Sequence, residues 1–394
     1  MNAPITVAPY QGLKVLDLSQ GVAGPYCAML LLKSGAEVIK VEPPSGDWSR
    51  GLGYAPEGMS APAISANLGK RSICIDAQNE RGRELIRTLA AQADIVIESF
   101  RPRVMKRLGL TYADLSKDKP NLIYVSVTAF GSDGPYAERP GTDSAIQAMS
   151  GMMEVNRDRN GNPRKVGILV VDIAAGIYTA QAIGAALYRR ATQGVGAYVE
   201  ISLLEVAAAV QSGAIVDETI RDGRVVQPLS LPSGTFATRD GHLIVTALHD
   251  RMFADLCKTI KKEEWITDAR FATVAARFES ADEINTTLEK ILREEPTSYW
   301  LEALGKSGVL CGKVSGYADF INDPQVKQQK LFQQVHHDGL GQVPVPRTPG
   351  SLDCVERPAP RKGEHGREIL AELGLSAGKI QELVDAGVVL ASVA

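Results

Sequence analysis

Histidine is scarce in this sequence, and its scarcity excludes several common catalytic and metal sites. Only five histidines occur among 394 residues, and all of them lie beyond residue 240. A Ser-His-Asp or Cys-His group within the first 240 residues is therefore excluded, unless a later segment or a second chain supplies the histidine. No HExxH or comparable spacing is present, so no metal site is predicted.

Paired cysteines, an export signal and a long apolar run are also missing. The five cysteines are scattered and form no CxxC pair, which favours a reduced, intracellular protein, and we expect a cytoplasmic one. The first residues lack a basic segment followed by an apolar run, so no signal peptide is expected. No stretch approaches the roughly 18 uncharged apolar residues of a membrane span, so no membrane partner is expected.

Neither sign of charge is in large excess. The chain has 43 Lys and Arg against 46 Asp and Glu, and a formal net charge of -3 gives no reason to expect a nucleic-acid partner. Hydrophobic residues make up 44% and charged residues 23%, which is typical of a globular protein. A length of 394 residues predicts more than one domain.

Apolar runs and helical segments alternate through the N-terminal half. Residues 14–18 and 37–41 read as buried strands, with a helix between them that has Pro25 in its first turn. Such a unit implies a parallel sheet with a right-handed crossover. Further strands are predicted at 72–75, 95–97, 122–127 and 198–203, and helices at 80–93, 145–153 and 173–188. The fold class is therefore α/β, with an open parallel sheet that binds ligands at the carboxyl ends of its strands.

The pattern changes after residue 205 and predicts a second domain. Residues 1–205 form the first part of the large domain, 206–224 a linker helix, and 225–325 a smaller α+β domain with a hairpin at 235–246. Five prolines between 344 and 360 then indicate a long extended return. Two short helices, at 366–373 and 377–386, end the chain, so 326–394 is expected to complete the large domain.

Two local patterns leave alternatives open. The turn Gly21–Pro25 reads G-x-x-G-P and not the G-x-G-x-x-G of dinucleotide-binding folds, so an NAD(P)-dependent oxidoreductase is an alternative, although the motif disfavours it. The basic run that contains Arg101 and Arg107 is either a solvated face or a site for an anion such as a nucleotide diphosphate.

Asp172 ends an apolar run and opens an alanine-rich helix. One interpretation is a helix N-cap, which aspartate often provides. The helix dipole would also hold such an acid ionised, and an ionised, partly desolvated carboxylate can attack an acyl group. The two interpretations are compatible.

Ordered motifs over nearly the whole chain carry a family resemblance. GLKVLDLSQGVAGPYCAMLLLKSGAEVIKVEPPSGDWSR (12–50) is followed by NLGKRSICID, ADIVIESFRP, RLGLTYADL, NLIYVSVTAFGSDGPYAERPGTD and VGILVVDIAAG. GTFATRDGHLIV, GVLCGKV, INDPQV and LVDAGVV continue the series in the last third. In this order they resemble the family III CoA-transferases, the CaiB/BaiF family.

The resemblance implies a fold and a reaction. The fold would be a Rossmann-like large domain with a small domain, in an interlocked homodimer. The enzyme would move CoA from an acyl-CoA donor such as succinyl-CoA to a free carboxylic acid, through an aspartyl anhydride and an aspartyl-CoA thioester on Asp172. Coenzyme A would be a substrate and not a permanently bound cofactor.

The resemblance also implies contacts with CoA, which fall at strand ends. They are Val22, Ala23, Ile75, Asp76, Ser99, Phe100, Arg101 and Arg107, while Thr142 and Asp143 match positions close to the catalytic aspartate. Val22 replaces the glutamine of formyl-CoA transferase, and no glycine-rich flap occurs between 220 and 240. A dicarboxylic acceptor is therefore expected, with Arg50, Arg139 and Tyr136 as candidates to hold its far carboxylate.

Related functions on the same fold remain as alternatives. An alpha-methylacyl-CoA racemase carries a histidine in a GHD triplet, and this chain has Gly141-Thr142-Asp143 there. Threonine cannot remove an α-proton at neutral pH, which disfavours the racemase. A CoA-binding protein without catalysis is a further alternative, disfavoured by the intact Asp172.

Overall fold

The computed structural model describes residues 8–158, 160–224, 230–350 and 357–390. Contacts divide the chain into two compact units, one formed by residues 1–215 and 331–394 and the other by residues 216–330. The predicted division into domains stays a prediction.

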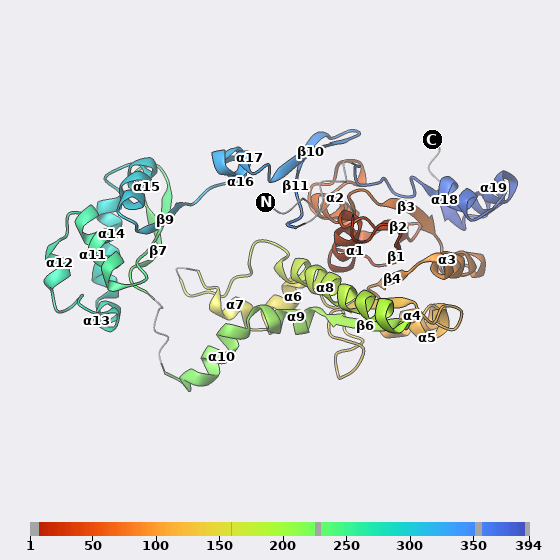
Figure 1. Ribbon diagram of the computed structural model, residues 1–394, viewed down its shortest axis with the longest axis horizontal. Helices are drawn as coiled ribbons and strands as arrows, with labels where there is room; N and C mark the ends of the chain where they lie inside the picture. Colours follow the sequence, from red (N-terminus) through yellow and green to blue (C-terminus); the bar gives the residue numbers. More distant parts are fainter. Residues whose placement is uncertain (1–7, 159, 225–229, 351–356, 391–394) are drawn as a thin grey trace. The chain divides into compact units, whose positions relative to one another are not determined.

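A seven-stranded sheet forms the centre of the first unit (Figure 1). Its order is β12-β3-β2-β1-β4-β5-β6, and every pairing is parallel except that of β12 with β3. The strands are β1 (Lys14–Asp17), β2 (Glu37–Glu42), β3 (Arg71–Ile75), β4 (Ile95–Glu98), β5 (Ile123–Thr128), β6 (Ala197–Ser202) and β12 (Val389–Leu390). The predicted α/β class with a large, mainly parallel sheet is confirmed, while β12 was not predicted.

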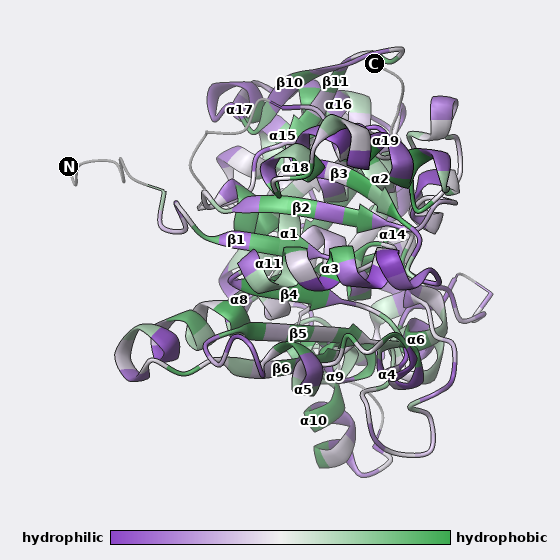
Figure 2. Ribbon diagram, turned by 90° about the vertical axis from the view of Figure 1, so that its right-hand side faces the viewer, coloured by the Kyte–Doolittle hydropathy of each residue, from purple (hydrophilic) through white to green (hydrophobic). Residues whose placement is uncertain are grey.

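The central strands are buried on both faces, which is why they read as continuous apolar runs. Every residue of β4 and β5 is buried, and Figure 2 shows hydrophobic colours along the middle of the sheet. Alternate residues pack on opposite faces: Val15 lies in one core cluster with residues of α1 (Ala23–Lys33) and α8 (Val170–Gln193). Leu16 lies in the other, with residues of α3 (Glu80–Gln92), α18 (Gly366–Glu372) and α19 (Ala377–Asp385).

Helix α8 is longer than its predicted range of 173–188. Gly176 lies where it packs on α1, and a Cβ there would come within 2.8 Å of the Tyr26 ring and 3.0 Å of the Ala23 carbonyl oxygen. Glycine therefore permits the close approach that brings the start of α8 beside the turn after β1.

Helix α8 also has the length and composition of a membrane span, alone among the helices of the described residues. The expectation that no stretch approaches such a length was wrong here, because residues 173–188 carry no charge. The helix contributes Val171, Ala175 and Ile183 to a core cluster. Core helices of soluble proteins pass the same test, so this is weak evidence for a membrane.

The return segment forms a hairpin where an extended stretch was predicted. Strands β10 (Phe332–His337) and β11 (Gly341–Pro346) pair only with each other among the described residues. Pro344 and Pro346 lack an N–H, and an edge strand tolerates them. Val335 and Val345 lie in a core cluster with Ile64 of α2 (Ala61–Asn67).

Short elements connect the sheet and its covering helices. These are η1 (Trp48–Gly51), η2 (Pro56–Gly58), α4 (Pro102–Leu108), α5 (Tyr112–Leu115), α6 (Asp143–Met149), α7 (Met152–Val155), α9 (Leu203–Val210) and α10 (Ser212–Arg221). The single linker helix predicted over 206–224 is two helices, because Gln211 (φ -106°, ψ 10°) departs from helical geometry.

The second unit contains an antiparallel sheet in the order β7-β8-β9. The strands are β7 (Ser233–Ala237), β8 (His242–Thr246) and β9 (Leu310–Lys313), so the predicted hairpin is confirmed and gains a third strand. The helices are α11 (Asp250–Thr259), α12 (Glu264–Thr267), α13 (Val274–Glu279), α14 (Ala281–Leu292), α15 (Thr297–Lys306), α16 (Tyr317–Asn322) and α17 (Pro324–Gln328). Phe253, Trp265 and Trp300 lie in its core.

Candidate active site

A cavity of about 510 Å³ lies at the carboxyl ends of the strands in the first unit. Parallel strands all end at this edge, so the loops after several strands converge there. The lining residues come from the turn after β1, the loop after β2, the loops after β4 and β5, and the start of α8. Of the predicted site residues, the cavity brings together Val22, Ala23, Ser99, Phe100, Arg101, Thr142, Asp143 and Asp172.

Asp172 is the third residue of α8, and its half-buried side chain lines this cavity. The expected N-cap role is wrong, because Leu169 occupies the N-cap position. Burial, reinforced by the charge of Asp143, raises the pKa of Asp172 from 3.8 to about 7. Desolvation therefore opposes the stabilisation of the ionised form that is expected from the helix dipole.

Asp143 supplies the capping interaction that Leu169 cannot make. One of its carboxylate oxygens accepts hydrogen bonds from the backbone N–H of Val171 at 2.8 Å and of Asp172 at 3.1 Å. The other accepts one from the side-chain amide of Gln147 at 2.6 Å. A buried acid from α6 thus satisfies the free N–H groups at the start of α8 and fixes the position of Asp172.

Asp47 stabilises the turn after β1 through a hydrogen bond to its backbone. The N–H of Gly21 donates to Asp47 Oδ1 at 3.0 Å, and Asp47 Oδ2 pairs with Lys40 Nζ at 2.9 Å. Lys40 Nζ also donates to the carbonyl oxygen of Ser19. These charges are buried, so each depends on its partners to offset desolvation.

A second buried pair braces the helix that follows the turn. Lys70 Nζ donates to Asp17 Oδ2 at 2.7 Å and to the carbonyl oxygen of Pro25 at 2.7 Å. Burial is the largest influence on the Lys70 ammonium and lowers its pKa to about 8. Sequence reasoning missed this buried network, and its only signal was the charged positions inside otherwise apolar strands.

Arginines surround an open hollow of about 710 Å³ that adjoins the cavity. The cavity and the hollow share Ser99, Phe100 and Arg101 in their linings, whereas Arg103 and Arg107 line the hollow and not the cavity. Glu98 stabilises the loop after β4, since its carboxylate accepts a hydrogen bond from the N–H of Phe100 at 2.7 Å. The arrangement is a cationic surface leading to a half-buried carboxylate.

Comparison with known families decides what kind of protein this is. The model of CoA-transferase family III matches residues 10–366. The chain belongs to CoA-transferase family III. It is therefore an enzyme, a transferase of CoA groups.

Relatives of the family resemble the chain over almost its whole length. The succinate–glutarate CoA-transferase of Agrobacterium fabrum is 34% identical over 389 residues, which cover 94% of this chain and 97% of that protein. The human succinyl-CoA:glutarate CoA-transferase is 33% identical over 396 residues, which cover 97% and 90%. The crystal structure of a CaiB/BaiF family protein from Brucella suis gives a TM-score of 0.84 at 35% identity, and covers 93% of this chain and 100% of that one.

Two residues predicted as CoA contacts line neither the cavity nor the adjoining hollow. The Ile75 side chain lies in a core cluster, and Asp76 Oδ1 accepts a hydrogen bond from the N–H of Gln78 at 2.9 Å. Ile75 is the last residue of β3 and Asp76 follows it, two strands away from β1 in the sheet. Their role as CoA contacts remains a prediction.

The three candidates for holding a far carboxylate differ in their surroundings. Arg50 forms two hydrogen bonds of 2.7 Å with the carboxylate of Glu42 and is not among the residues that line the cavity. Arg139 does line the cavity, and its guanidinium carbon lies 4.4 Å from the centre of the Tyr136 ring. Trp48, which sequence reasoning missed, lines the cavity as well.

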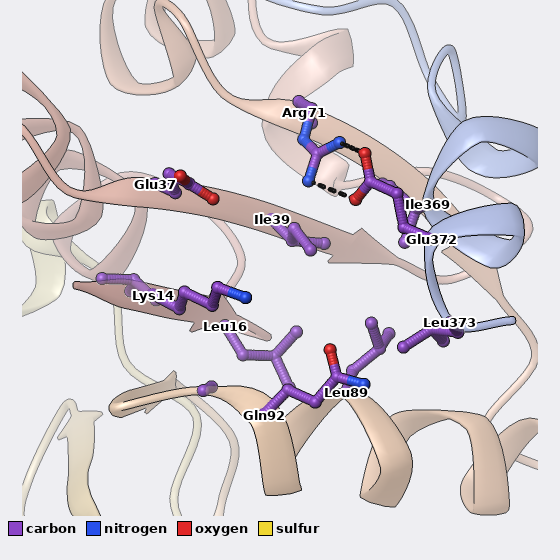
Figure 3. Close-up of a pocket in the computed structure, with 12 residues that line it drawn as sticks. Lys14, Leu16, Glu37, Ile39, Arg71, Leu89, Gln92, Ile369, Glu372 and Leu373 are labelled. Carbon is purple, nitrogen blue, oxygen red and sulfur yellow. Dashed lines mark hydrogen bonds and ion pairs between the residues drawn. The ribbon is translucent and has the colours of Figure 1, made fainter. Parts of the chain in front are cut away.

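A smaller pocket lies at the amino ends of the strands of the family III chain. Figure 3 shows Arg71 pointing at Glu372 there, with Lys14 and Glu37 also on its wall. Arg71 forms hydrogen bonds of 2.6 and 2.9 Å with Glu372, so its charge is already paired. A volume of about 60 Å³ is too small for a CoA ester, so this pocket is not the candidate active site.

Proposed function

We propose that this enzyme moves CoA from a donor such as succinyl-CoA to a free dicarboxylic acid, with Asp172 as the nucleophile. The observation that carries the proposal is the half-buried Asp172 carboxylate in a cavity that adjoins a cationic hollow. No histidine is among the lining residues, so the carboxylate is the group suited to covalent chemistry. The relatives named for succinyl-CoA and glutarate support a dicarboxylic substrate.

The proposed reaction begins with two exchanges at Asp172. A carboxylate oxygen of Asp172 attacks the thioester carbonyl carbon of the donor, and the C–S bond breaks. CoA leaves as a thiolate, and an aspartyl anhydride is formed. The thiolate then attacks the aspartyl carbonyl carbon, the anhydride C–O bond breaks, and the donor acid leaves as a carboxylate. An aspartyl-CoA thioester remains.

The same exchanges in reverse load the acceptor. Its carboxylate attacks the aspartyl thioester and releases the CoA thiolate, which gives a second anhydride. The thiolate attacks the acceptor carbonyl carbon, and the C–O bond to Asp172 breaks. The new acyl-CoA and the free Asp172 carboxylate result, with no water and no proton consumed. Water has to be kept out, because it would hydrolyse both intermediates.

The surroundings of Asp172 suit this chemistry. A pKa of about 7 leaves a large fraction of the group ionised near neutral pH, and desolvation makes that carboxylate more reactive. Asp143 would keep the attacking oxygens in place through its hydrogen bonds to the start of α8. Arg101 and Arg107 would bind the CoA phosphates, beside the backbone of Val22 and Ala23.

A homodimer in the cytoplasm is part of the proposal. Large apolar side chains on α8 and α10 are exposed in the single chain, with Ile177 at 53%, Tyr188 at 74% and Ile220 at 73%. A second copy of the chain would cover such groups, as interlocking requires.

A substrate panel tests the proposed function. The protein is incubated with succinyl-CoA and an equimolar set of mono- and dicarboxylic acids, and new CoA esters are identified by mass spectrometry. We expect dicarboxylyl-CoA esters to form at the expense of succinyl-CoA. Hydrolysis alone, with no new ester, would refute transfer to an acid.

The pH dependence of the reaction should follow Asp172. Because the carboxylate form attacks, kcat/KM is expected to rise with pH, with a midpoint near 7, and to fall about tenfold per unit well below it. Initial rates between pH 5.5 and 8.5 measure this rise, the acid limb of the pH–rate profile. A midpoint near 4 would show that Asp172 is not desolvated as the structure indicates.

Gly21→Ala should weaken acyl-CoA binding. Gly21 has φ +84°, and a Cβ there would lie 2.4 Å from Cζ2 of Trp48, so both the turn and the Trp48 ring must shift. We expect a roughly tenfold or larger rise in KM for succinyl-CoA and a loss of stability on the order of 1–3 kcal/mol. Steady-state kinetics and thermal unfolding measure the two effects.

Gly51→Ala is the matched control for this change. Gly51 lies in the neighbouring loop after β2, and a Cβ there would meet nothing within 4 Å. The control should bind succinyl-CoA as the unmodified enzyme does. Equal KM values for both variants would show that the turn is not a binding element.

A further inference from the structure

We propose that Arg139 is the residue that selects dicarboxylic substrates, by binding the carboxylate at the end remote from the reacting carbonyl. The inference rests on the proposed function and names the side chain that determines its specificity. Arg139 lines the cavity that contains Asp172, so both groups face the same space.

Aromatic rings hold Arg139 in place. Its guanidinium carbon lies 4.4 Å from the centre of the Tyr136 ring, a distance typical of a cation–π contact. The Tyr136 ring lies edge-on to Phe130, with ring centres 5.7 Å apart. The contact with a supported ring restrains the guanidinium, and its exposed N–H groups stay available to bind a carboxylate.

The charge of Arg139 is not neutralised by the protein. No carboxylate oxygen lies within 4.0 Å of its side chain in the parts of the chain that the structure describes. Two other arginines at this edge of the sheet are paired, Arg50 with Glu42 at 2.7 Å and Arg103 with Glu138 at 3.3 Å. An unpaired guanidinium beside a cavity is suited to bind an incoming carboxylate with two hydrogen bonds.

The other charged groups of the cavity have different tasks. Asp143 is committed to the start of α8 and to Gln147, and Asp172 is the nucleophile. Arg101 also lines the outer hollow with Arg107, where the CoA phosphates are proposed to bind. Arg139 is therefore the cation that remains for the acyl chain among the described residues that line the cavity.

One cation can recognise both the donor and the acceptor. Each acid in turn is bonded to Asp172 through its reacting carboxyl group, so their far ends occupy the same place at different times. Loss of Arg139 should therefore impair both half-reactions with dicarboxylic groups. Monocarboxylic groups of the same length have no far charge and should be little affected.

Matched substrate pairs test this assignment. The full-length Arg139→Gln variant is assayed with succinyl-CoA and glutarate, and with butyryl-CoA and pentanoate, which have the same numbers of carbon atoms. We expect the ratio of kcat/KM for the dicarboxylic pair to that for the monocarboxylic pair to fall roughly 10- to 100-fold. Arg139→Lys should recover part of the ratio, since it keeps the charge and loses the planar two-pronged geometry.

A charge-matched control and the unmodified enzyme separate the outcomes. Arg293→Gln removes an exposed arginine of the second unit that pairs with Glu289, and it should leave both pairs unchanged. If Arg139→Gln lowers both pairs equally, or neither, the specificity role is wrong while CoA transfer stands. If the unmodified enzyme transfers CoA between neither pair, the proposed function fails and the assignment fails with it.

Discussion

Asp172→Asn is expected to lower CoA transfer by at least about 1,000-fold. The amide cannot form the anhydride, and no second carboxylate is positioned to replace it, because Asp143 is held by backbone N–H groups. Formation of glutaryl-CoA from succinyl-CoA and glutarate, followed by mass spectrometry, measures the loss. Asp118→Asn is the matched control, since Asp118 is an exposed aspartate of the first unit outside both hollows.

The same variant should be more stable than the unmodified enzyme at pH 8. The folded-state pKa of about 7 lies above the ordinary 3.8, so the folded protein binds more protons than the unfolded chain between these values. Its stability therefore falls as pH rises through that window, and asparagine removes this cost. A gain on the order of 1–3 kcal/mol at pH 8, and little at pH 4, is expected in denaturant titrations. If Asp172→Asn is inactive because it is unfolded, its loss of activity is not evidence that Asp172 is the nucleophile.

Asp143→Asn is the second substitution with a large expected effect. It removes the charge that adds to burial in raising the pKa of Asp172, and it weakens the cap of α8, so kcat at pH 8 should fall roughly 100-fold. The acid limb of the pH–rate profile should also move to lower pH, because one of the two causes of the raised pKa is lost.

The shift of the acid limb separates electrostatic positioning from a general loss of structure. Asp143→Ala, which removes the cap entirely, should reduce thermal stability further, while its acid limb moves in the same direction. A pH–rate profile for Asp143→Asn that keeps the midpoint of the unmodified enzyme would contradict the role given to Asp143. Gln147→Ala would then show whether the position of the loop before α8 depends on the side-chain amide of Gln147 and not on Asp143.

The parallel sheet could be predicted because its strands are buried on both faces. Residues 95–97 are all apolar, and residues 122–127 are apolar except for Ser126, as burial on both faces favours. Strand β12 has two residues, too few for any pattern, and the hairpin of β10 and β11 is hidden by the prolines in β11. Local sequence therefore revealed the six strands from β1 to β6, and it missed β12 and the separate hairpin.

The candidate site could be predicted only as positions along the chain. Asp172 was recognisable from its place at a helix start, whereas the capping of that helix depends on Asp143, which lies 29 residues earlier. Likewise, Lys40 and Asp47 act on Gly21 through contacts that no local pattern encodes. The raised pKa of Asp172 follows from burial and from Asp143, so it required the tertiary structure.

Covalent capture of the nucleophile tests the central claim most directly. The enzyme is mixed with succinyl-CoA and hydroxylamine, which converts an acylated aspartyl side chain to a hydroxamate, and is then digested and analysed by peptide mass spectrometry. We predict a hydroxamate on Asp172 that depends on succinyl-CoA and is missing from Asp172→Asn. Continued turnover with no mark on the peptide that contains Asp172, or with the mark on another carboxylate, would contradict it.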